Sequence, residues 1–381
     1  MKIGITCMPS AGGSGVLATE LGLALAERGH EVHFVTVETP FRLEHFRENV
    51  FAHVVDTITY PLFRTPPYTL ALAAKIYEVA SEHGIEIWHA HYAIPNAASA
   101  LLARDMLPEP KRFCLVTTLH GTDITLVGSD PSFFSVTRHV MERSCEITAV
   151  SAWLARETAT LFELSRQPRV IHNFFDPRKF YPRPVNRRIL AADHEKIIMH
   201  ISNFRPVKRV TDVVRAFRKT LDRIEARLIF VGDGPERISA VSVARQLGVA
   251  DRITHLGNIT NIEELLPAAD LVFQPSEHES FGLVPLEAMA CEVPVLATAS
   301  GGIVEVIEDG VTGYLVEVGD IETMAARAIE LLSDPDRGKT MGRLARQRVQ
   351  ERFTPEKIIP LYEALYAEVL EKYRQKLHSG R

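Results

Sequence analysis

The chain has 381 residues, of which 46% are hydrophobic and 24% are charged, a composition typical of a soluble globular protein. This length exceeds the usual limit of a single domain, so two domains are expected. A formal net charge of −5 and a sequence pI near 6.3 give no basic field, which argues against nucleic acid as the main partner.

The N-terminus leads directly into a strand pattern and lacks the long apolar segment of a secretory signal. No stretch of the sequence is long and apolar enough to span a bilayer. The four cysteines lie in or beside apolar runs and form no C-x-x-C pair: Cys7, Cys114, Cys145 and Cys291. Reduced, buried thiols are the expectation, and these features together favour a cytoplasmic protein that does not act at a membrane.

Apolar runs rich in β-branched residues alternate with helical periodicity, which predicts an α/β fold with parallel sheets covered by helices. The strands predicted in the first half are residues 2–7, 31–37, 85–90, 113–119, 146–150 and 169–172. Those predicted in the second half are residues 196–202, 227–231, 252–256, 271–274 and 293–297. A proline- and arginine-rich stretch, residues 177–188, predicts a linker between the two series. We therefore expect one domain over residues 1–176 and another over residues 189–354.

A glycine-rich loop, residues 9–15, follows the first strand and precedes a helix predicted over residues 16–28, which Gly29 ends. Glycines at such a place let backbone N–H groups approach a phosphate at the N-terminus of a helix. A tight turn that binds no ligand is the plain alternative.

The same loop carries a second pattern. Gly13, Gly15 and Ala18 match G-x-G-x-x-A, and Glu38 follows the second predicted strand, as in dinucleotide-binding proteins. An NAD-dependent oxidoreductase is therefore the alternative from another reaction class.

Polar side chains stand at the carboxyl ends of two further predicted strands, where ligands bind in open α/β sheets. His120 follows the strand over residues 113–119. His89 and His91 share one face of a strand, but no third ligand stands at recognisable spacing, so we expect no metal there. Tyr92 beside them is a candidate for substrate contact.

Arg138 lies in the helix predicted over residues 133–143. Its guanidinium is able to pair bidentately with a carboxylate. A solvated helix arginine is the alternative.

The second half begins with two cations after its first predicted strand. Arg205 and Lys208 are three positions apart on one side of a turn, directly after Asn203. Two cations in this arrangement stabilise the negative charge that develops on a departing phosphate. An exposed basic loop is the alternative. Residues 232–234 predict a structural glycine turn, because they lack the G-K-[ST] ending of a P-loop.

Two carboxylates, Glu279 and Glu287, bracket a turn and the start of a helix predicted over residues 282–291. Glu279 lies in the loop, where it is able to accept hydrogen bonds from sugar hydroxyls. Glu287 lies on the helix, where it is able to hold ribose hydroxyls. The backbone amides of Phe281 and Gly282 would face an anion at the helix start. Taken alone, two solvated surface glutamates are the more ordinary interpretation.

With its inserted Ser280, Phe281 and Gly282, this E-x7-E pattern resembles the donor-site signature of the retaining glycosyltransferases of family 4. The resemblance implies the GT-B fold, with two Rossmann-like parallel-sheet domains facing a cleft. It also implies that a C-terminal helix, predicted from residue 355 to 376, crosses back so that about residues 355–381 join the first domain. Members of the family need no metal for catalysis, and we expect none here.

The resemblance also implies the roles of individual residues, which extend over both halves of the chain. The implied catalytic residues are His120, Arg205, Lys208 and Glu279. The implied donor-binding residues are Gly13, Asn203, Arg205, Lys208, Gly257, Asn258, Glu279, Ser280, Phe281, Gly282 and Glu287. The implied acceptor-binding residues are Ser14, Tyr92, Thr118 and Arg138.

Further motifs resemble one branch of family 4, and they cover nearly the whole chain: residues 5–7, 12–15, 40–43, 66–68, 89–93, 117–125 and 207–210. The branch transfers N-acetylglucosamine from UDP to the hydroxyl of L-malate with retention, in the first step of bacillithiol synthesis. UDP-N-acetylglucosamine and L-malate are thus the implied partners, with no cofactor, and a homo-oligomer stays open. The alternatives are an inositol phosphate or lipid-linked sugar as acceptor, and a sugar-nucleotide sensor without turnover.

Overall fold

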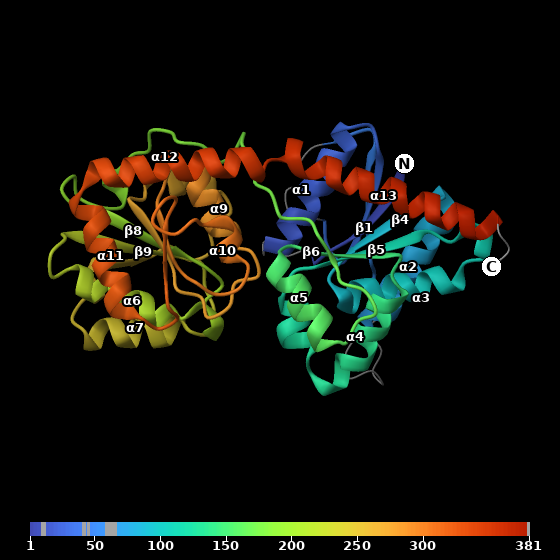
Figure 1. The fold of residues 1–381 in the computed structure, drawn as a ribbon, viewed down its shortest axis with the longest axis horizontal. Coiled ribbons are helices and arrows are strands. Elements are labelled where there is room, and N and C mark those ends of the chain that lie inside the picture. Colours follow the sequence, from blue (N-terminus) through green and yellow to red (C-terminus); the bar gives the residue numbers. More distant parts are fainter. Residues whose placement is uncertain (9–12, 40–42, 44–45, 58–66, 379–381) are drawn as a thin grey trace. The chain divides into compact units, whose positions relative to one another are not determined.

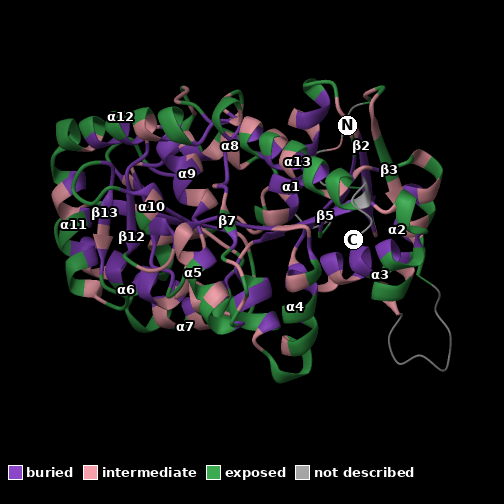
Figure 2. Ribbon diagram, turned by 45° about the vertical axis from the view of Figure 1, so that its right-hand side comes forward, coloured by how far each residue is buried: buried purple, intermediate pink, exposed green. Residues whose placement is uncertain are grey.

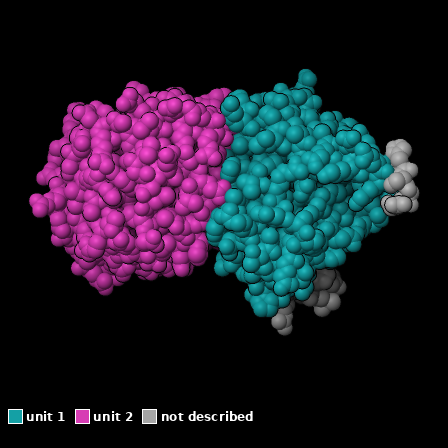
Figure 3. Space-filling view, in the orientation of Figure 1, with its two compact units in different colours: residues 1–173, 355–381 teal, residues 174–354 magenta. Residues whose placement is uncertain are grey.

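A computed structural model describes residues 1–8, 13–39, 43, 46–57 and 67–378 of the chain (Figure 1). The chain forms two compact units, which are coloured separately in Figure 3. Unit 1 comprises Met1–Asn173 with Pro355–Arg381, and unit 2 comprises Phe174–Thr354. The stretch predicted as a linker, residues 177–188, falls within unit 2. In that stretch Arg187 forms a bidentate pair with Asp270, at 3.1 and 2.5 Å.

Unit 1 is built on a parallel sheet with seven strands in the described residues, in the order β3-β2-β1-β4-β5-β6-β7. Its strands are β1 Lys2–Thr6, β2 Glu31–Thr36, β3 Val50–Val54, β4 Ile87–His91, β5 Cys114–Leu119, β6 Glu146–Ala149 and β7 Arg169–Val170. Its main helices are α1 Gly13–Glu27, α2 Tyr68–His83, α3 Ala98–Met106, α4 Pro131–Arg143, α5 Ala152–Leu161 and α13 Pro355–His378. The six strands predicted for this half are confirmed to within two residues at each end, and β3 was not predicted.

Unit 2 has a second parallel sheet, of six strands within its described residues, in the order β10-β9-β8-β11-β12-β13. The strands are β8 Lys196–Ile201, β9 Ala226–Val231, β10 Ile253–His255, β11 Leu271–Gln274, β12 Val295–Thr298 and β13 Tyr314–Val316. The helices are α6 Val210–Thr220, α7 Arg237–Gln246, α8 Ile262–Leu265, α9 Leu283–Ala290, α10 Ile303–Val306, α11 Ile321–Ser333 and α12 Pro335–Arg352. The prediction for this half misses only β13.

Each sheet is covered by helices on both faces, which explains the continuous apolar strands that the sequence shows. In unit 1, every residue of β4 and of β5 is buried. In unit 2, Phe217, Phe230 and Phe273 pack in one core at 1% exposure or less. Figure 2 shows buried residues along the strands and the inward sides of the helices, with exposed residues on the outer faces of α4 and α12. No helix in the described ranges has both the length and the apolar character needed to cross a membrane.

Helix α1 begins at Gly13, three positions before the predicted start at residue 16. Glycine has a low helix propensity, so Gly13 and Gly15 were assigned to the loop, whereas both lie in the first turn of the helix. Gly29 ends the helix as predicted, with φ +86° and its N–H donating to the Ala26 carbonyl at 2.9 Å.

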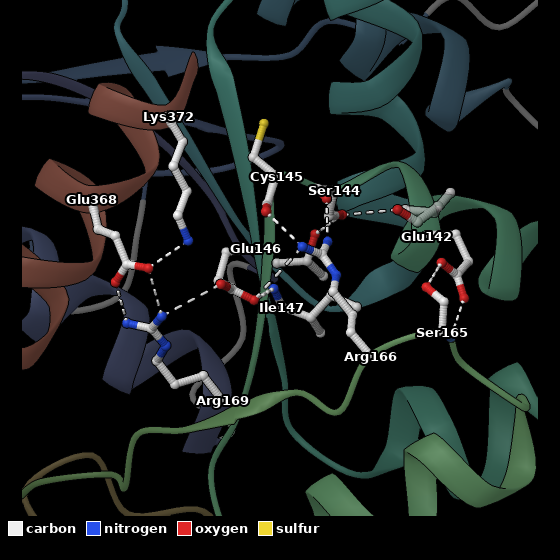
Figure 4. A network of polar contacts seen from close by, with 12 residues as sticks. Glu142, Ser144, Cys145, Glu146, Ile147, Ser165, Arg166, Arg169, Glu368 and Lys372 are labelled. Carbon is white, nitrogen blue, oxygen red and sulfur yellow. Dashed lines mark hydrogen bonds and ion pairs between the residues drawn. The ribbon is translucent and has the colours of Figure 1, made fainter. Parts of the chain in front are cut away.

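The C-terminal helix α13 belongs to unit 1, although it follows the whole of unit 2 in the sequence. Polar contacts attach it to the strands, as Figure 4 shows. Arg169 of β7 forms two hydrogen bonds to the Glu368 carboxylate, at 2.9 and 3.1 Å, and also lies 3.7 Å from Glu146. Lys372 adds a bond to Glu368 at 2.6 Å. Exposed ion pairs such as these contribute little to stability, so the position of the helix depends mainly on its inner face, which packs in the core, where Tyr366 is fully buried.

The buried face of α13 reaches a polar network inside the unit 1 sheet. His89 of β4 is fully buried, with Nδ1 2.7 Å from the Tyr366 hydroxyl and Nε2 2.6 Å from Thr118 Oγ1. Unit 2 has a counterpart in His200 of β8, with Nδ1 2.9 Å from the Phe273 carbonyl and Nε2 2.8 Å from Ser202 Oγ. Burial lowers the pKa of His89 to about 3 and that of His200 to about 4. Both imidazoles are therefore neutral in the folded protein at neutral pH.

Because both histidines are buried and neutral, we expect the fold to lose stability in acid. Below about pH 6.5, which is the pKa of an unfolded-state histidine, these two histidines are protonated in the unfolded chain but not in the folded chain. The free energy of unfolding therefore falls as the pH falls. The loss should amount to about 1.4 kcal/mol per pH unit for each histidine between about pH 6 and pH 4. Calorimetric unfolding over this range checks it.

The variant His200→Gln should reduce this pH dependence by one histidine's share, because glutamine does not titrate. The matched control is His194→Gln, since His194 is 67% exposed and pairs only at the surface with Glu225. An unchanged slope in the His200 variant would contradict the assignment.

Candidate functional site

The site in unit 2 arises where two neighbouring parallel strands end. β8 and β11 pair directly, with Ile198 opposite Leu271, so the loops that follow them leave the sheet at the same edge. The Glu277 N–H donates to the Val207 carbonyl at 2.8 Å and joins the two loops. As a result Lys208 Nζ lies 2.6 Å from Glu279 Oε2. The structure thus brings together two of the predicted catalytic residues.

The Glu279 carboxylate is held through one of its two oxygens. Besides Lys208, Oε2 accepts hydrogen bonds from Gln274 Nε2 at 3.2 Å and from Ser276 Oγ at 3.3 Å. No bond from the described chain reaches Oε1. The Lys208 and Glu279 side chains are 19% and 16% exposed, so their attraction is less screened than that of a surface pair. The arrangement orients a carboxylate and leaves one oxygen for a ligand.

The backbone at Glu279 is fixed by a glycine pair that follows β12. The Gly302 N–H donates to the Glu279 carbonyl at 2.7 Å. Gly301 has φ +81°, and a Cβ on it would lie 2.2 Å from the same carbonyl oxygen. Only glycine permits this close approach and this conformation. The loop that carries Glu279 is therefore positioned from β12 as well as from β11.

The loop after β8 presents several cations, most of which are already paired. Lys208 pairs with Glu279, and Arg209 donates to Asp212 at 2.6 Å. The Asp212 carboxylate also accepts a hydrogen bond from Arg215 of α6 at 2.8 Å. Arg205 is exposed and forms no ion pair within the part of the chain that the structure describes. Its neighbour Phe204 is fully buried and anchors the loop. Arg205 is therefore a cation available to an anionic ligand.

Asn203, predicted to bind the donor, is exposed on the same loop. The predicted glycine turn packs directly beneath it: a Cβ on Gly234 would lie 2.1 Å from the Asn203 carbonyl oxygen, and one on Gly232 would lie 1.8 Å from that of Ser202. This contact confirms a structural turn at this place. The Gly232 N–H also donates to the Gly257 carbonyl at 2.7 Å, which uses one backbone group of the predicted base-binding segment.

The remaining predicted donor residues lie around the start of α9 and after β10. Gly257 has φ +68° and is half-buried, and Asn258 is exposed. Phe281 is 2% exposed and packs edge-on against Phe353, so its side chain belongs to the core and only its backbone can face a ligand. Ser280 and Glu287 are half-buried, and Gly282 has φ +99°. The roles of all these residues in donor binding stay predictions.

In unit 1 the carboxyl ends of β4 and β5 bring a second group together. His91 Nδ1 lies 2.9 Å from His120 Nε2, and the Tyr92 ring lies 5.3 Å from that of His120. The Ser14 hydroxyl donates to the Tyr92 hydroxyl at 3.1 Å. Tyr92 has φ +81°, an uncommon backbone conformation for a residue with a side chain. Three residues with predicted roles, Ser14, Tyr92 and His120, thus share one location.

A buried aspartate fixes this location. Asp123 accepts backbone hydrogen bonds from Ala93 at 3.1 Å, from His120 at 3.1 Å and from Gly121 at 2.9 Å. Burial raises the pKa of the Asp123 carboxyl to about 6, although the three backbone bonds oppose that rise. Burial lowers the pKa of His120 to about 3. His120 therefore acts as a neutral hydrogen-bonding group at neutral pH.

Three other predicted residues lie apart from this group or are differently engaged. Thr118 is fully buried and its hydroxyl bonds to His89 and, at 2.6 Å, to Thr148, contacts typical of a positioning residue. Arg138 is 45% exposed and donates to the Glu163 carbonyl at 3.3 Å. Gly13 is the first residue of α1, and the rest of its loop, residues 9–12, lies outside the described residues. Their ligand roles stay predictions.

Three branch-specific motifs fall partly on residues that the structure does not describe: residue 12 of the segment 12–15, residues 40–42 of the segment 40–43, and residue 66 of the segment 66–68. The sequence reasoning in turn missed Gln274, Ser276 and Asp123 as supporting residues. All three stand within five positions of a predicted residue, and a polar side chain at the carboxyl end of an apolar strand is the signal that marks Gln274. The side-chain amide oxygen of Gln274, Oε1, is buried without a hydrogen-bond partner in the described ranges.

Comparison with known families gives two adjacent matches. Residues 11–179 match the model of Glycosyltransferase Family 4, and residues 183–348 match that of Glycosyl transferases group 1. Among solved structures, sucrose-phosphate synthase from Thermosynechococcus elongatus has a TM-score of 0.81 at 23% identity, covering 98% of this chain and 100% of its own. The Anabaena protein Alr3699/HepE, in a crystal structure with UDP and glucose, has a TM-score of 0.80 at 22% identity, covering 96% and 99%. The fold is therefore that of the GT-B glycosyltransferases, as predicted.

A curated relative is much closer in sequence. N-acetyl-alpha-D-glucosaminyl L-malate synthase of Bacillus anthracis is 49% identical over 373 residues, which is 97% of each chain. The chain therefore belongs to the family of glycosyltransferases that contains this synthase.

Proposed function

We propose that this protein transfers N-acetylglucosamine from UDP-N-acetylglucosamine to the hydroxyl of L-malate. The observation that carries the proposal is the 49% identity, over 97% of both chains, to a protein named N-acetyl-alpha-D-glucosaminyl L-malate synthase. The Lys208 and Glu279 arrangement supports it, because it supplies a cation and an oriented carboxylate at the edge of the unit 2 sheet.

The proposal assigns the UDP-sugar to unit 2. When the bond between the anomeric carbon and the phosphate oxygen breaks, negative charge develops on the departing diphosphate. Arg205 and Lys208 would stabilise that charge, at about 1.5–3 kcal/mol for each charged hydrogen bond. Glu279 holds Lys208 in place through Oε2. Once Lys208 turns to the diphosphate, the Glu279 carboxylate becomes available to the sugar hydroxyls.

The proposal assigns L-malate to unit 1. Malate carries two carboxylates and one hydroxyl, and the hydroxyl groups of Ser14 and Tyr92 would be partners for one end of it. Arg138, which bonds to Glu163 and has no contact with these two residues in the structure, would have to turn toward the other carboxylate. His120 would support the sugar as a neutral hydrogen-bonding partner. The malate hydroxyl oxygen forms the new bond to the anomeric carbon, and its proton leaves on the departing phosphate oxygen.

The transfer would proceed with retention. The relative's name specifies an alpha-glucosaminyl product, and the sugar of UDP-N-acetylglucosamine is itself alpha-linked to phosphate. No carboxylate is assigned as a covalent nucleophile, in contrast with retaining glycosidases. We also propose that catalysis needs no metal ion, because Arg205 and Lys208 supply the positive charge that a metal would bring to the leaving group.

The direct test measures UDP release by purified protein supplied with UDP-N-acetylglucosamine. L-malate should accelerate the release, and D-malate and inositol phosphate should not. A chelator should leave the initial rate unchanged at 25 °C, and proton NMR of the product should show an alpha linkage. Release that depends on inositol phosphate would move the proposal to another acceptor. Binding of NADH, with no UDP release under any condition, would favour an oxidoreductase.

Two variants test the donor assignment. Lys208→Ala removes a cation from the leaving group, and Glu279→Gln removes the charge that orients both Lys208 and the sugar. Each should lower kcat by about 10²- to 10³-fold while the protein stays folded by circular dichroism. The matched controls are Lys219→Ala, which removes an exposed lysine paired with Glu322, and Glu277→Gln, which changes an exposed glutamate of the same loop. Wild-type rates in the first two variants would refute the assignment.

A third variant tests the acceptor assignment. Arg138→Lys keeps the charge and loses the planar, bidentate geometry, so the KM for L-malate should rise by about 10-fold or more while the KM for the UDP-sugar stays constant. Arg143→Lys is the control on the same helix, since Arg143 is exposed and lies 3.6 Å from Asp105. Equal KM values for malate in the two variants would remove Arg138 from the acceptor site.

A further inference from the structure

Three histidines of unit 1 that have no part in the proposed transfer form a compact cluster. His33 lies on β2, His53 on β3, and His83 is the last residue of α2. One ring nitrogen from each lies within 4.8 Å of those of the other two. The side chain of His33 is fully buried, and that of His83 is 30% exposed.

The fold explains why these three residues meet. In the pairing of β2 with β3, Val35 stands opposite His53, and His33 is two positions from Val35, so both histidines point to the same face of the sheet. Helix α2 covers that face and ends at His83, where Gly84 adopts the left-handed conformation with φ +66°. The His83 ring then lies 4.4 Å from that of His33 and 5.6 Å from that of His53.

The hydrogen bonds of His33 resemble those of a metal-binding histidine. Its Nε2 lies 3.0 Å from the Glu31 carboxylate, which accepts the Nε2 proton and leaves Nδ1 with a lone pair. That Nδ1 faces His53 Nε2 at 3.0 Å. A carboxylate that fixes the tautomer and orientation of a histidine in this way is the usual support of a histidine that ligates a metal.

Two of the three histidines lie in surroundings that disfavour a charged imidazole. Burial is the main cause that lowers the pKa of His33, and it lowers the pKa of His53 to about 4, with further contributions from the neighbouring histidines. The charged groups nearby are Lys2 beside Glu31, Lys75 with Glu78 on α2, and Glu82, whose carboxylate lies 3.9 Å from His83 Nε2. For both facing nitrogens to hold a lone pair toward one ion, the proton of His53 must lie on Nδ1 and not on Nε2.

We propose that His33, His53 and His83 form a binding site for a divalent transition-metal ion, with Zn²⁺ as the best-suited ion. Three imidazole nitrogens favour zinc over magnesium or calcium, which prefer oxygen ligands. Nitrogen ligands at about 2.0–2.1 Å from a tetrahedral ion lie about 3.3 Å apart, so only His83 needs to approach the pair formed by His33 and His53. A fourth ligand would come from solvent on the side of His83.

The role of this ion would be structural. β3 is the edge strand of the unit 1 sheet and pairs, within the described residues, with β2 alone. A metal ion bound by β2, β3 and the end of α2 would join three elements that otherwise meet through one strand pairing and packing. None of the three histidines is among the residues assigned to the UDP-sugar or to malate, so the site is independent of the transfer proposed above.

Zinc binding to the full chain, purified without a histidine tag and stripped of metal, tests the proposal. Titration calorimetry with Zn²⁺ should show one tight ion per chain, Co²⁺ should give the visible absorption of a tetrahedral nitrogen site, and Zn²⁺ should raise the melting temperature. Glu31→Gln should weaken zinc binding by about 10- to 100-fold. His83→Gln should weaken it further, because it removes a ligand rather than a support.

The control is His139→Gln, which changes an exposed histidine of α4 in the same unit and should leave zinc affinity unchanged. His83 is partly exposed, so its variant should fold even if variants of His33 do not. Zinc affinity in His83→Gln equal to that of the unchanged protein would overturn the proposal, as would the absence of binding at micromolar Zn²⁺. Because the readouts are affinity, absorption and melting temperature, either result is independent of whether malate is the acceptor.

Discussion

The proposed donor site depends on the ion pair between Lys208 and Glu279. These residues are 71 positions apart in the sequence, and they meet because β8 and β11 are neighbours that run in the same direction. A half-buried ion pair has lost part of its hydration and is stable only where other bonds replace the lost water. Gln274 and Ser276 provide those bonds, and Gly301 lets the loop after β12 approach the Glu279 backbone closely. The pair therefore requires three correctly aligned strands.

The sequence predicts every inner strand of the two sheets, and it also predicts β7 and β10 at one edge of each sheet. The two strands that it misses, β3 and β13, lie at the opposite edges. The prediction for residues 271–274 agrees with the whole of β11, because a short apolar run between turn signals has few other stable structures. Val50–Val54 and Tyr314–Val316 are the terminal strands of their sheets. The first is largely solvent-accessible, and the second is only three residues long. Pairing with one neighbour, which is a tertiary contact, determines both.

The candidate site could be predicted as far as its residues are close in sequence. Arg205, Lys208 and Glu279 were identified from local spacing within single loops. Sequence spacing does not predict the direction in which a side chain points. The Thr118 hydroxyl points into the sheet toward His89, and Phe281 packs in the core. The cluster of histidines on β2, β3 and α2 likewise depends on strand register and on where a helix ends, and neither can be read from spacing.

The position of α13 has a consequence for how the protein folds during synthesis. Unit 2 is continuous in the sequence, so its residues leave the ribosome in one uninterrupted stretch. The unit can fold as soon as the last of them has emerged. Unit 1 begins first but lacks Tyr366, the partner of the buried His89, until almost the whole chain has been made. The N-terminal sheet therefore lacks α13 on one of its faces while unit 2 is translated. The first unit to start folding is the last to finish.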